Sequence, residues 1–247
     1  MQRFSIPLAA ALLLWSGPSF ASEEVEAFVE ANLLSIFYHE LGHALIDIEA
    51  VPIFGQEEDA ADVFSIFLID ALFEEEDAQS IAFDAAWGFL GEAMLREEMR
   101  EEVAWWDVHG PDEQRFYNTV CVFYGAVPEQ REELAEALEL PEERAEYCPF
   151  EYDQANDAWG SVLDEIWRED ARGTIRLAAE GGPEAVATRA VVEPEIEMLN
   201  REFELSEPLT VRVESCGEAN ASYDPETLSI TMCSEFETHL RDMASRF

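Results

Sequence analysis

The chain has 247 residues, of which 48% are hydrophobic, so it can bury a sizeable core and is not a disordered protein. Its 55 acidic residues greatly outnumber its 14 basic residues, all of which are arginine, and the formal net charge is −41. A surface of this charge repels nucleic acid and anionic lipid, which excludes both as partners.

The first 21 residues have the features of an export signal. Arg3 supplies a positive charge, and the apolar run over residues 6–15 is too short to span a bilayer as a stable helix. Ser19-Phe20-Ala21 then offers a small-x-small cleavage site. We expect residues 1–21 to be a signal peptide and residues 22–247 to be a single domain without a membrane span, periplasmic or secreted in a bacterium. An uncleaved membrane anchor is the alternative.

Apolar residues at helical spacing dominate the chain up to about residue 203. The first helix is predicted over residues 23–48, and Pro52 and Gly55 interrupt the chain after it. Gly110-Pro111-Asp112 is a turn that starts a later helix. Helices are predicted after the first one at residues 57–75, 79–106, 112–124, 129–138, 142–147, 152–168 and 184–203.

The pattern changes towards the C-terminus. Residues 209–213 and 228–232 alternate between apolar and polar side chains and are rich in β-branched residues, which is typical of strands. The segment Tyr223-Asp224-Pro225-Glu226 between them has the composition of a turn. The sequence therefore predicts a mainly helical domain with a small C-terminal β-hairpin, which is an α+β fold class.

The first predicted helix carries the segment His39-Glu40-Leu41-Gly42-His43. Histidines four residues apart lie one turn apart on one helix face, so both imidazoles can reach one ion. Zinc accepts imidazole nitrogen, and three protein ligands leave its fourth position for water. In this motif the glutamate takes a proton from that water as it attacks a carbonyl carbon. The motif predicts zinc-dependent hydrolysis with Glu40 as general base; two histidines that cap helix carbonyls are the alternative.

A third ligand is expected at the start of the second predicted helix. Glu58 and Asp62 have the Glu-x-x-x-Asp spacing of the gluzincin class of zinc peptidases. In that class the glutamate is the third zinc ligand, and the aspartate binds the outer nitrogen of a ligand histidine and fixes its tautomer. Glu57 and Asp59 are interpreted as surface charge. In another helix register Glu57 or Asp62 would ligate instead, and an ordinary acidic first turn is a further alternative.

Other residues are candidates for contact with a substrate. Hydrolysis of a carbonyl compound needs a donor for the developing oxyanion, and His109, which Asp107 can orient, is the leading candidate. A loop histidine without a catalytic role is the alternative. Asn220 is expected to line the cleft, unless it is only a turn residue. The remaining candidates for the oxyanion or the substrate are Arg115, Tyr117 and Tyr223.

The sequence contains four cysteines, and an even number in an exported protein predicts disulfides. Of the three possible pairings, Cys121–Cys148 and Cys216–Cys233 are favoured because each pair brackets its own segment. A metal site built from cysteines is the alternative, but no C-x-x-C spacing supports it.

The chain resembles a bacterial family of putative metallopeptidases that is described only as a domain of unknown function. The similar stretches include residues 38–45, residues 52–62 and the segments that begin at Gln114 and Cys216, and the resemblance as a whole covers most of residues 22–247. The resemblance implies a zincin-like metallopeptidase with a zinc cofactor and a peptide or protein substrate. The family tends to have tyrosine after the last cysteine, where this chain has Ser234.

The predicted order of elements departs from that of the familiar zincins, in which a sheet precedes the metal helix and its edge strand binds the peptide. Here the only predicted strands are C-terminal. We expect the C-terminal hairpin to pack beside the helix of His39 and to supply the edge that binds the substrate. The alternative functions are an exported binding domain without catalysis and a structural zinc domain. The structural domain needs a fourth protein ligand, and the sequence indicates none.

Overall fold

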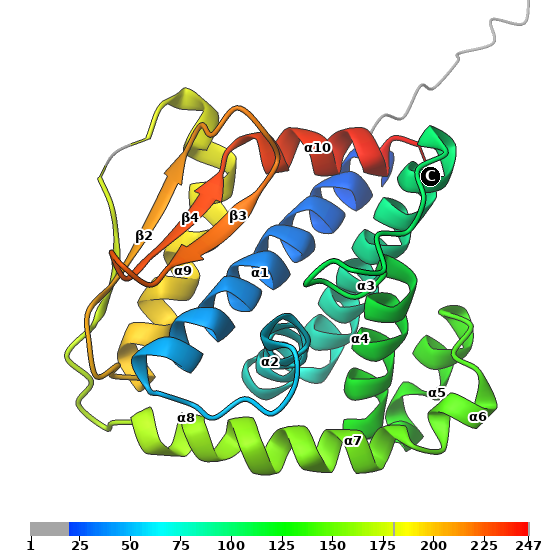
Figure 1. The fold of residues 1–247 in the computed structure, drawn as a ribbon, viewed down its shortest axis with the longest axis horizontal. Coiled ribbons are helices and arrows are strands. Elements are labelled where there is room, and N and C mark those ends of the chain that lie inside the picture. The colour runs from blue at the N-terminus through cyan, green and yellow to red at the C-terminus, as the bar shows by residue number, and fades with distance from the viewer. Residues whose placement is uncertain (1–19, 180, 247) are drawn as a thin grey trace, which may run out of the picture.

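A computed structural model of the chain describes residues 20–179 and 181–246 (Figure 1). The predicted signal peptide lies outside the described residues as far as residue 19. Most of the described chain is helical, in the order α1 (Phe20–Ile48), α2 (Glu57–Leu72), α3 (Glu75–Met99), α4 (Asp112–Ala126), α5 (Pro128–Ala137), α6 (Glu142–Ala145), α7 (Cys148–Ala155), α8 (Ser161–Ile166), α9 (Val186–Glu202) and α10 (Glu235–Ala244). The strands are β1 (Ile175–Leu177), β2 (Leu209–Glu214), β3 (Ala221–Asp224) and β4 (Ser229–Cys233).

The helix α1 forms the centre of the fold (Figure 1). It contacts α2, α3, α9 and α10, and it also packs against β3 and β4. Its apolar residues recur every three or four positions and are buried, among them Leu33, Phe37 and Leu41. A Cβ atom at Gly42 would lie 3.1 Å from the Cα atom of Ala61, so the glycine allows the backbones of α1 and α2 to approach closely. This close approach brings the start of α2 next to the histidines of α1.

The predicted third helix ends earlier than expected. The helix α3 stops at Met99, because Arg100 adopts a left-handed backbone conformation with φ of 58°. Residues 100–111 form a loop instead of the predicted last two helical turns. Trp105 and Trp106 are 79% and 85% exposed, so they bury little apolar surface that would hold a helix against the core. The prediction of one helix over residues 152–168 is close, since α7, a π-helical turn (Asn156–Gly160) and α8 follow one another without a break.

The four strands form one sheet in the order β1-β2-β4-β3. The prediction that residues 209–213 and 228–232 pair as a hairpin is wrong, because β2 and β4 are parallel. The chain between them is long enough to form β3, which pairs with β4 in antiparallel fashion and takes up Tyr223 and Asp224. The turn follows at residues 225–228. The hairpin is therefore β3–β4, and β3 is the edge strand that packs against α1 (Figure 1).

Two disulfides are present, and both pairings agree with the sequence prediction. Cys121 of α4 is bonded to Cys148 at the start of α7, with the Cα atoms 5.0 Å apart. Cys216 is bonded to Cys233 at the end of β4, with the Cα atoms 5.4 Å apart. Among the described residues, no helix has the length and apolar character needed to cross a membrane.

Candidate metal centre

Three histidines and one glutamate from three separate segments converge on one point. The helix α1 presents His39 and His43, the first turn of α2 presents Glu58, and the loop of residues 100–111 presents His109. The Oε2 atom of Glu58 lies 3.2 Å from Nε2 of His39, 3.2 Å from Nε2 of His43 and 3.0 Å from Nε2 of His109. The Nε2 atoms of His39 and His43 are 3.2 Å apart. The three imidazole nitrogens thus surround one carboxylate oxygen, and the donor atoms of His39, Glu58 and His109 all lie within 4.8 Å of one another.

The donor set suits a zinc ion. Imidazole nitrogen and carboxylate oxygen are ordinary zinc ligands, with bonds of about 2.0–2.1 Å that place tetrahedral ligand atoms roughly 3.3 Å apart. The distances from Glu58 Oε2 to the three Nε2 atoms, and between the Nε2 atoms of His39 and His43, are 3.0 to 3.2 Å and are close to that value. The convergence of His109 also supplies the fourth possible ligand that the sequence did not indicate.

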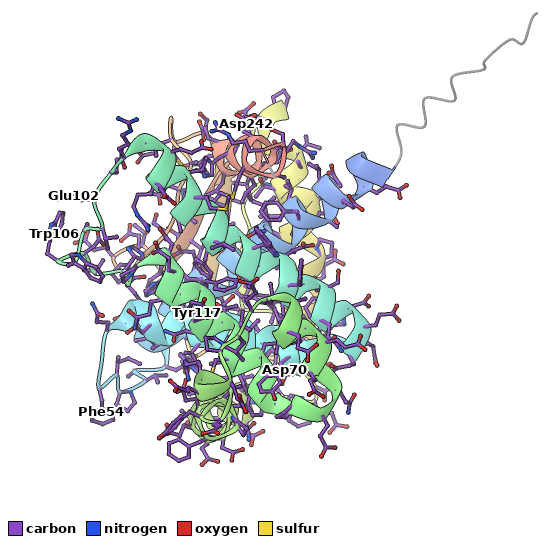
Figure 2. The ribbon with its side chains drawn as sticks, turned by 90° about the vertical axis from the view of Figure 1, so that its right-hand side faces the viewer. Phe54, Asp70, Glu102, Trp106, Tyr117 and Asp242 are labelled. Carbon is purple, nitrogen blue, oxygen red and sulfur yellow. A yellow bond between two sulfur atoms is a disulfide. The ribbon has the colours of Figure 1, made fainter. Side chains whose placement is uncertain are left out.

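The helical histidines differ from the loop histidine in exposure. The side chains of His39 and His43 are 11% and 12% exposed, whereas that of His109 is 46% exposed. The loop of His109 is tied to the loop before α2, because the side-chain amide of Gln56 donates to the carbonyl oxygen of Val108 at 3.1 Å. Figure 2 shows Phe54 and Trp106 projecting outward from these two loops, on the same side of the molecule. Two helix residues thus form the fixed part of the centre, and a loop residue completes it.

Acidic side chains hold the outer nitrogens of all three histidines. Nδ1 of His39 lies 2.8 Å from Oδ1 of Asp62, although it is not aligned for a hydrogen bond, and Nδ1 of His43 lies 2.8 Å from Oε1 of Glu57. Nδ1 of His109 lies 3.3 Å from Oδ1 of Asp107. A carboxylate in this position favours the proton on Nδ1 and leaves the lone pair of Nε2 directed inward.

Two residues around the histidines, Glu57 and Arg115, have other contacts than the sequence analysis expected. Glu57 was expected to be surface charge, but it contacts His43 while remaining 52% exposed. Arg115 was a candidate for contact with a substrate oxyanion, but its Nε and Nη2 atoms both donate to Asp62, at 2.7 Å each. A histidine that binds a metal usually has a partner for its outer nitrogen. The position of Glu57 directly before Glu58 was therefore a signal in the sequence that could have identified it as the partner of His43.

The charges of the cluster shift one another's pKa values strongly. Hydrogen bonds from His109, His39 and His43 hold the pKa of Glu58 far below its usual range. Burial lowers the pKa of His39, but its contacts with Asp62 and Glu58 outweigh burial and raise the pKa to about 9. Protons and a metal ion would compete for the same nitrogen atoms, so binding of a metal here would release protons.

Glu40 occupies the position next to the converging donors. It is 6% exposed, and burial raises the pKa of its carboxyl group, while the nearby histidine charges oppose that effect. Its side chain borders two cavities that also share His39, His109, Asn220 and Ala221 as lining residues. One is an open groove of about 990 Å³, and the other is a smaller cavity of about 200 Å³. The cluster therefore lies where two cavities meet.

The edge strand β3 forms one wall of the open groove. Asn220, Ala221, Ser222 and Tyr223 line it opposite Glu57 and Glu58. The hydroxyl group of Tyr223 donates to Oδ2 of Asp47 on α1 at 2.8 Å, which fixes the strand to the metal helix. The C-terminal sheet thus packs beside the helix of His39, as the sequence analysis expected. Tyr117 lines neither cavity.

A family model with the description putative metallopeptidase (DUF4344) matches residues 14–163 and 179–246. The match covers well over half of the chain and includes all residues of the histidine cluster. Searches of curated proteins and of solved structures return no match.

Proposed function

Because the chain belongs to the DUF4344 family of putative metallopeptidases, we propose that it is a zinc-dependent peptidase with a zincin-like centre. His39, His43 and Glu58 are the zinc ligands in this proposal. The observation that carries it is the convergence of both α1 imidazoles on one oxygen of Glu58, at 3.2 Å each, beside the carboxyl group of Glu40. This arrangement fits the order of roles in the His-Glu-x-x-His motif.

When bound, the zinc ion would polarise a substrate carbonyl and make a water molecule more acidic. Glu40 accepts the proton of the attacking water and then donates it to the nitrogen of the leaving amine, so the peptide bond breaks without net proton consumption. Burial supports this role, because it raises the pKa of Glu40 towards the range of an effective proton carrier. Asp62 and Glu57 hold the imidazole rings of His39 and His43 in the ligating orientation.

His109 is proposed to donate from Nε2 to the oxyanion that develops on the substrate carbonyl, in the doubly protonated form of its ring, which the hydrogen bond to Glu58 favours by raising the pKa of His109. Its Nε2 atom reaches the centre, but it comes from a loop and its side chain is 46% exposed. A residue held in this way can leave Glu58 when a substrate enters the groove, whereas His39 and His43 are fixed by a buried helix. The neighbouring Asp107 accepts from the backbone N–H of His109 at 3.1 Å and orients the ring.

The substrate is proposed to be a peptide or protein segment that lies along β3. This strand ends the sheet order, so one of its edges is not paired with another strand of the described sheet. An extended peptide can add to such an edge through main-chain hydrogen bonds. Asn220 and Tyr223 line the groove beside that edge and would contact the substrate.

The site of action is proposed to be the periplasm or the exterior of a bacterium. The two disulfides are compatible with an oxidising compartment. The signal-peptide pattern of residues 1–21 supports the same location.

A closed zinc site without catalysis is the second candidate function. One observation favours it: His109 Nε2 lies 3.0 Å from Glu58 Oε2, so the centre has four possible protein ligands. A zinc ion with four protein ligands has no position left for water and is structural. The two functions differ in what they require of His109 and Glu40.

The test combines zinc content with turnover of a peptide mixture by the mature protein. We expect about one zinc ion per chain, which His43→Ala removes. Glu40→Gln is expected to keep the zinc and lose about 10²- to 10⁴-fold in kcat/KM. His109→Ala is expected to keep the zinc and lose part of the activity. Zinc without turnover in the wild type, together with loss of zinc in His109→Ala, would establish the structural site instead.

A further inference from the structure

The smaller cavity beside the centre is enclosed mainly by helices. Its walls come mainly from α1, α2, α3, α4 and α10, and Ala221 of β3 and the loop residues His109 and Asn220 also line it. The apolar side chains that line it are those of Ile36, Ile66, Ala85, Phe89, Phe236 and Leu240. The cavity shares His39, Glu40, His109 and Asn220 with the open groove. A chain bound in the groove can therefore insert one side chain into the cavity at the reaction centre.

The charged groups that border this cavity already have partners. Asp62 is paired with Arg115, Asp112 with Arg96, and Glu92 with His239. The remaining titratable groups are Glu40, His39 and His109, which line the groove as well as the cavity. A charged ligand side chain would therefore lose its hydration without finding an unpaired counter-ion deep in the cavity, whereas an apolar one would bury its surface.

The far end of the cavity is closed at a defined depth. Asn32 and Gly88 line it, with Asn32 about two turns along α1 from His39, and a Cβ atom at Gly88 would lie 1.8 Å from Oδ1 of Asn32. The amide of Asn32 is fixed because it donates to the carbonyl oxygens of Phe28 and Asp84, at 2.8 and 2.9 Å. The space of about 200 Å³ in front of this wall is larger than the roughly 150 Å³ apolar cavity that holds one benzene molecule. It suits a side chain the size of leucine, methionine or phenylalanine.

We propose that this cavity is the specificity pocket, and that it receives the apolar side chain of one of the two residues that flank the scissile bond. The inference rests on the proposed peptidase function and names its substrate class: peptides with leucine, methionine or phenylalanine at that position. Pocket contacts of this kind discriminate by about 10- to 100-fold in kcat/KM between a fitting side chain and glycine. Aspartate and lysine are excluded more strongly than glycine, because their charges have no partner there.

The test is a mixture of peptides that differ at the residues around one bond, incubated with the zinc-loaded mature protein, with cleavage positions determined by mass spectrometry. The expected result is cleavage beside leucine, methionine or phenylalanine, with glycine, aspartate and lysine at least tenfold slower at that position. Equal rates for apolar and charged residues would overturn the pocket assignment alone. If none of the peptides were cleaved, the proposed function would be overturned, and this inference with it.

Two variants connect the preference to the cavity. Ile36→Trp fills part of it from α1 and is expected to shift the preference about tenfold towards alanine and glycine. The matched control is Ile81→Trp on α3, which lines a separate cavity next to α9 and should leave the preference unchanged. Leu240→Ala widens the cavity and should improve the relative rate for tyrosine and tryptophan. If Ile36→Trp and Leu240→Ala both remain folded and zinc-loaded and leave the preference unchanged, the specificity lies outside this cavity.

Discussion

Two buried clusters of arginine and aspartate lie on the same helix and look alike at first. Asp62 and Asp70 both belong to α2, roughly two turns apart. Asp62 pairs with Arg115 of α4 at 2.7 Å, and Asp70 pairs with Arg131 of α5 at 2.6 Å. Each guanidinium group also lies over a phenylalanine ring, at 4.3 and 3.6 Å from the centroid.

The clusters differ in where their contacts end. Asp70 accepts from the hydroxyl of Tyr152 at 2.7 Å, and Arg131 uses its other donors on Glu75 and on a backbone carbonyl. Asp62 instead contacts His39, whose inner nitrogen faces the groove beside Glu58. Buried charge alone therefore does not mark a functional site. In the proposed metal centre, by contrast, the polar contacts of Asp62 lead to donor atoms that converge beside a cavity.

The largest expected effect is on the free energy of unfolding, and it concerns the cluster of Asp70 and Arg131, whose contacts do not lead to the cavities. Arg131→Met leaves Asp70 buried with a hydroxyl as its remaining partner and should lower the free energy of unfolding by about 3–5 kcal/mol. Denaturant unfolding measures this, and the zinc content of the folded fraction should not change. Unchanged stability would contradict the structural role, and loss of zinc from stably folded protein would contradict the separation of the two clusters.

The next effect is a dependence of stability on pH, which is expected for the cluster of Asp62 through its contact with His39. The raised pKa of His39, about 9 in the metal-free protein against an ordinary 6.5, stabilises the fold below pH 6.5, and this contribution is lost as the pH rises through 9. At about 1.4 kcal/mol per pKa unit, the metal-free protein should lose up to about 3 kcal/mol over this interval. Unfolding of metal-free protein at pH 6 and pH 9.5 tests it, with His39→Ala as the control that should lack this part of the change. Zinc affinity should move in the opposite direction, because protons compete for the same nitrogens.

Substitution of the two aspartates sharpens the comparison at the metal. Asp62→Asn should weaken zinc binding by about 10- to 100-fold, because it removes the carboxylate that orients His39. Asp70→Asn is the matched control on the same helix and should leave zinc affinity unchanged. Competition with a chelator of known affinity measures both. Equal losses in the two variants would mean that α2 as a whole, rather than Asp62, supports the centre.

The smallest effect is expected for the exposed partner of His43. Glu57→Gln keeps a side chain of similar shape but removes a charge that is 52% exposed. Water can replace part of its contact, so the loss of zinc affinity should be about tenfold or less. The same chelator competition measures it. A larger loss than that of Asp62→Asn would show that burial does not govern the strength of these supporting contacts.

The sequence predicts the parts of this molecule that depend on local pattern. The helical spacing of apolar residues defines α1, and the spacing within it places His39, Glu40 and His43 on neighbouring turns. Glu58 and Asp62 follow from the same reasoning, because one helix turn separates them. Local patterns thus indicate which residues share a face.

Contacts between distant segments are less accessible from the sequence. His109 reaches Glu58 through a loop whose path depends on where α3 stops, and no periodic pattern encodes that path. The sheet shows the same limit. Residues 209–213 and 228–232 each have the pattern of a strand, but alternation does not specify whether two strands are parallel. The short strand β3 between them was not predicted, because its last residues, Tyr223 and Asp224, belong to a segment with the composition of a turn.

The disulfide between Cys216 and Cys233 closes a covalent loop that contains the β3 wall of the groove. It closes a ring with a sequence separation of 17 residues, and the ring contains all of β3 together with Asn220 and Tyr223. His39, His43, Glu58 and His109 lie outside that ring. Reduction therefore releases a constraint on the wall where a substrate would lie and none on the histidine cluster. We therefore expect the groove wall to respond more strongly to reduction of this bond than the histidine cluster does.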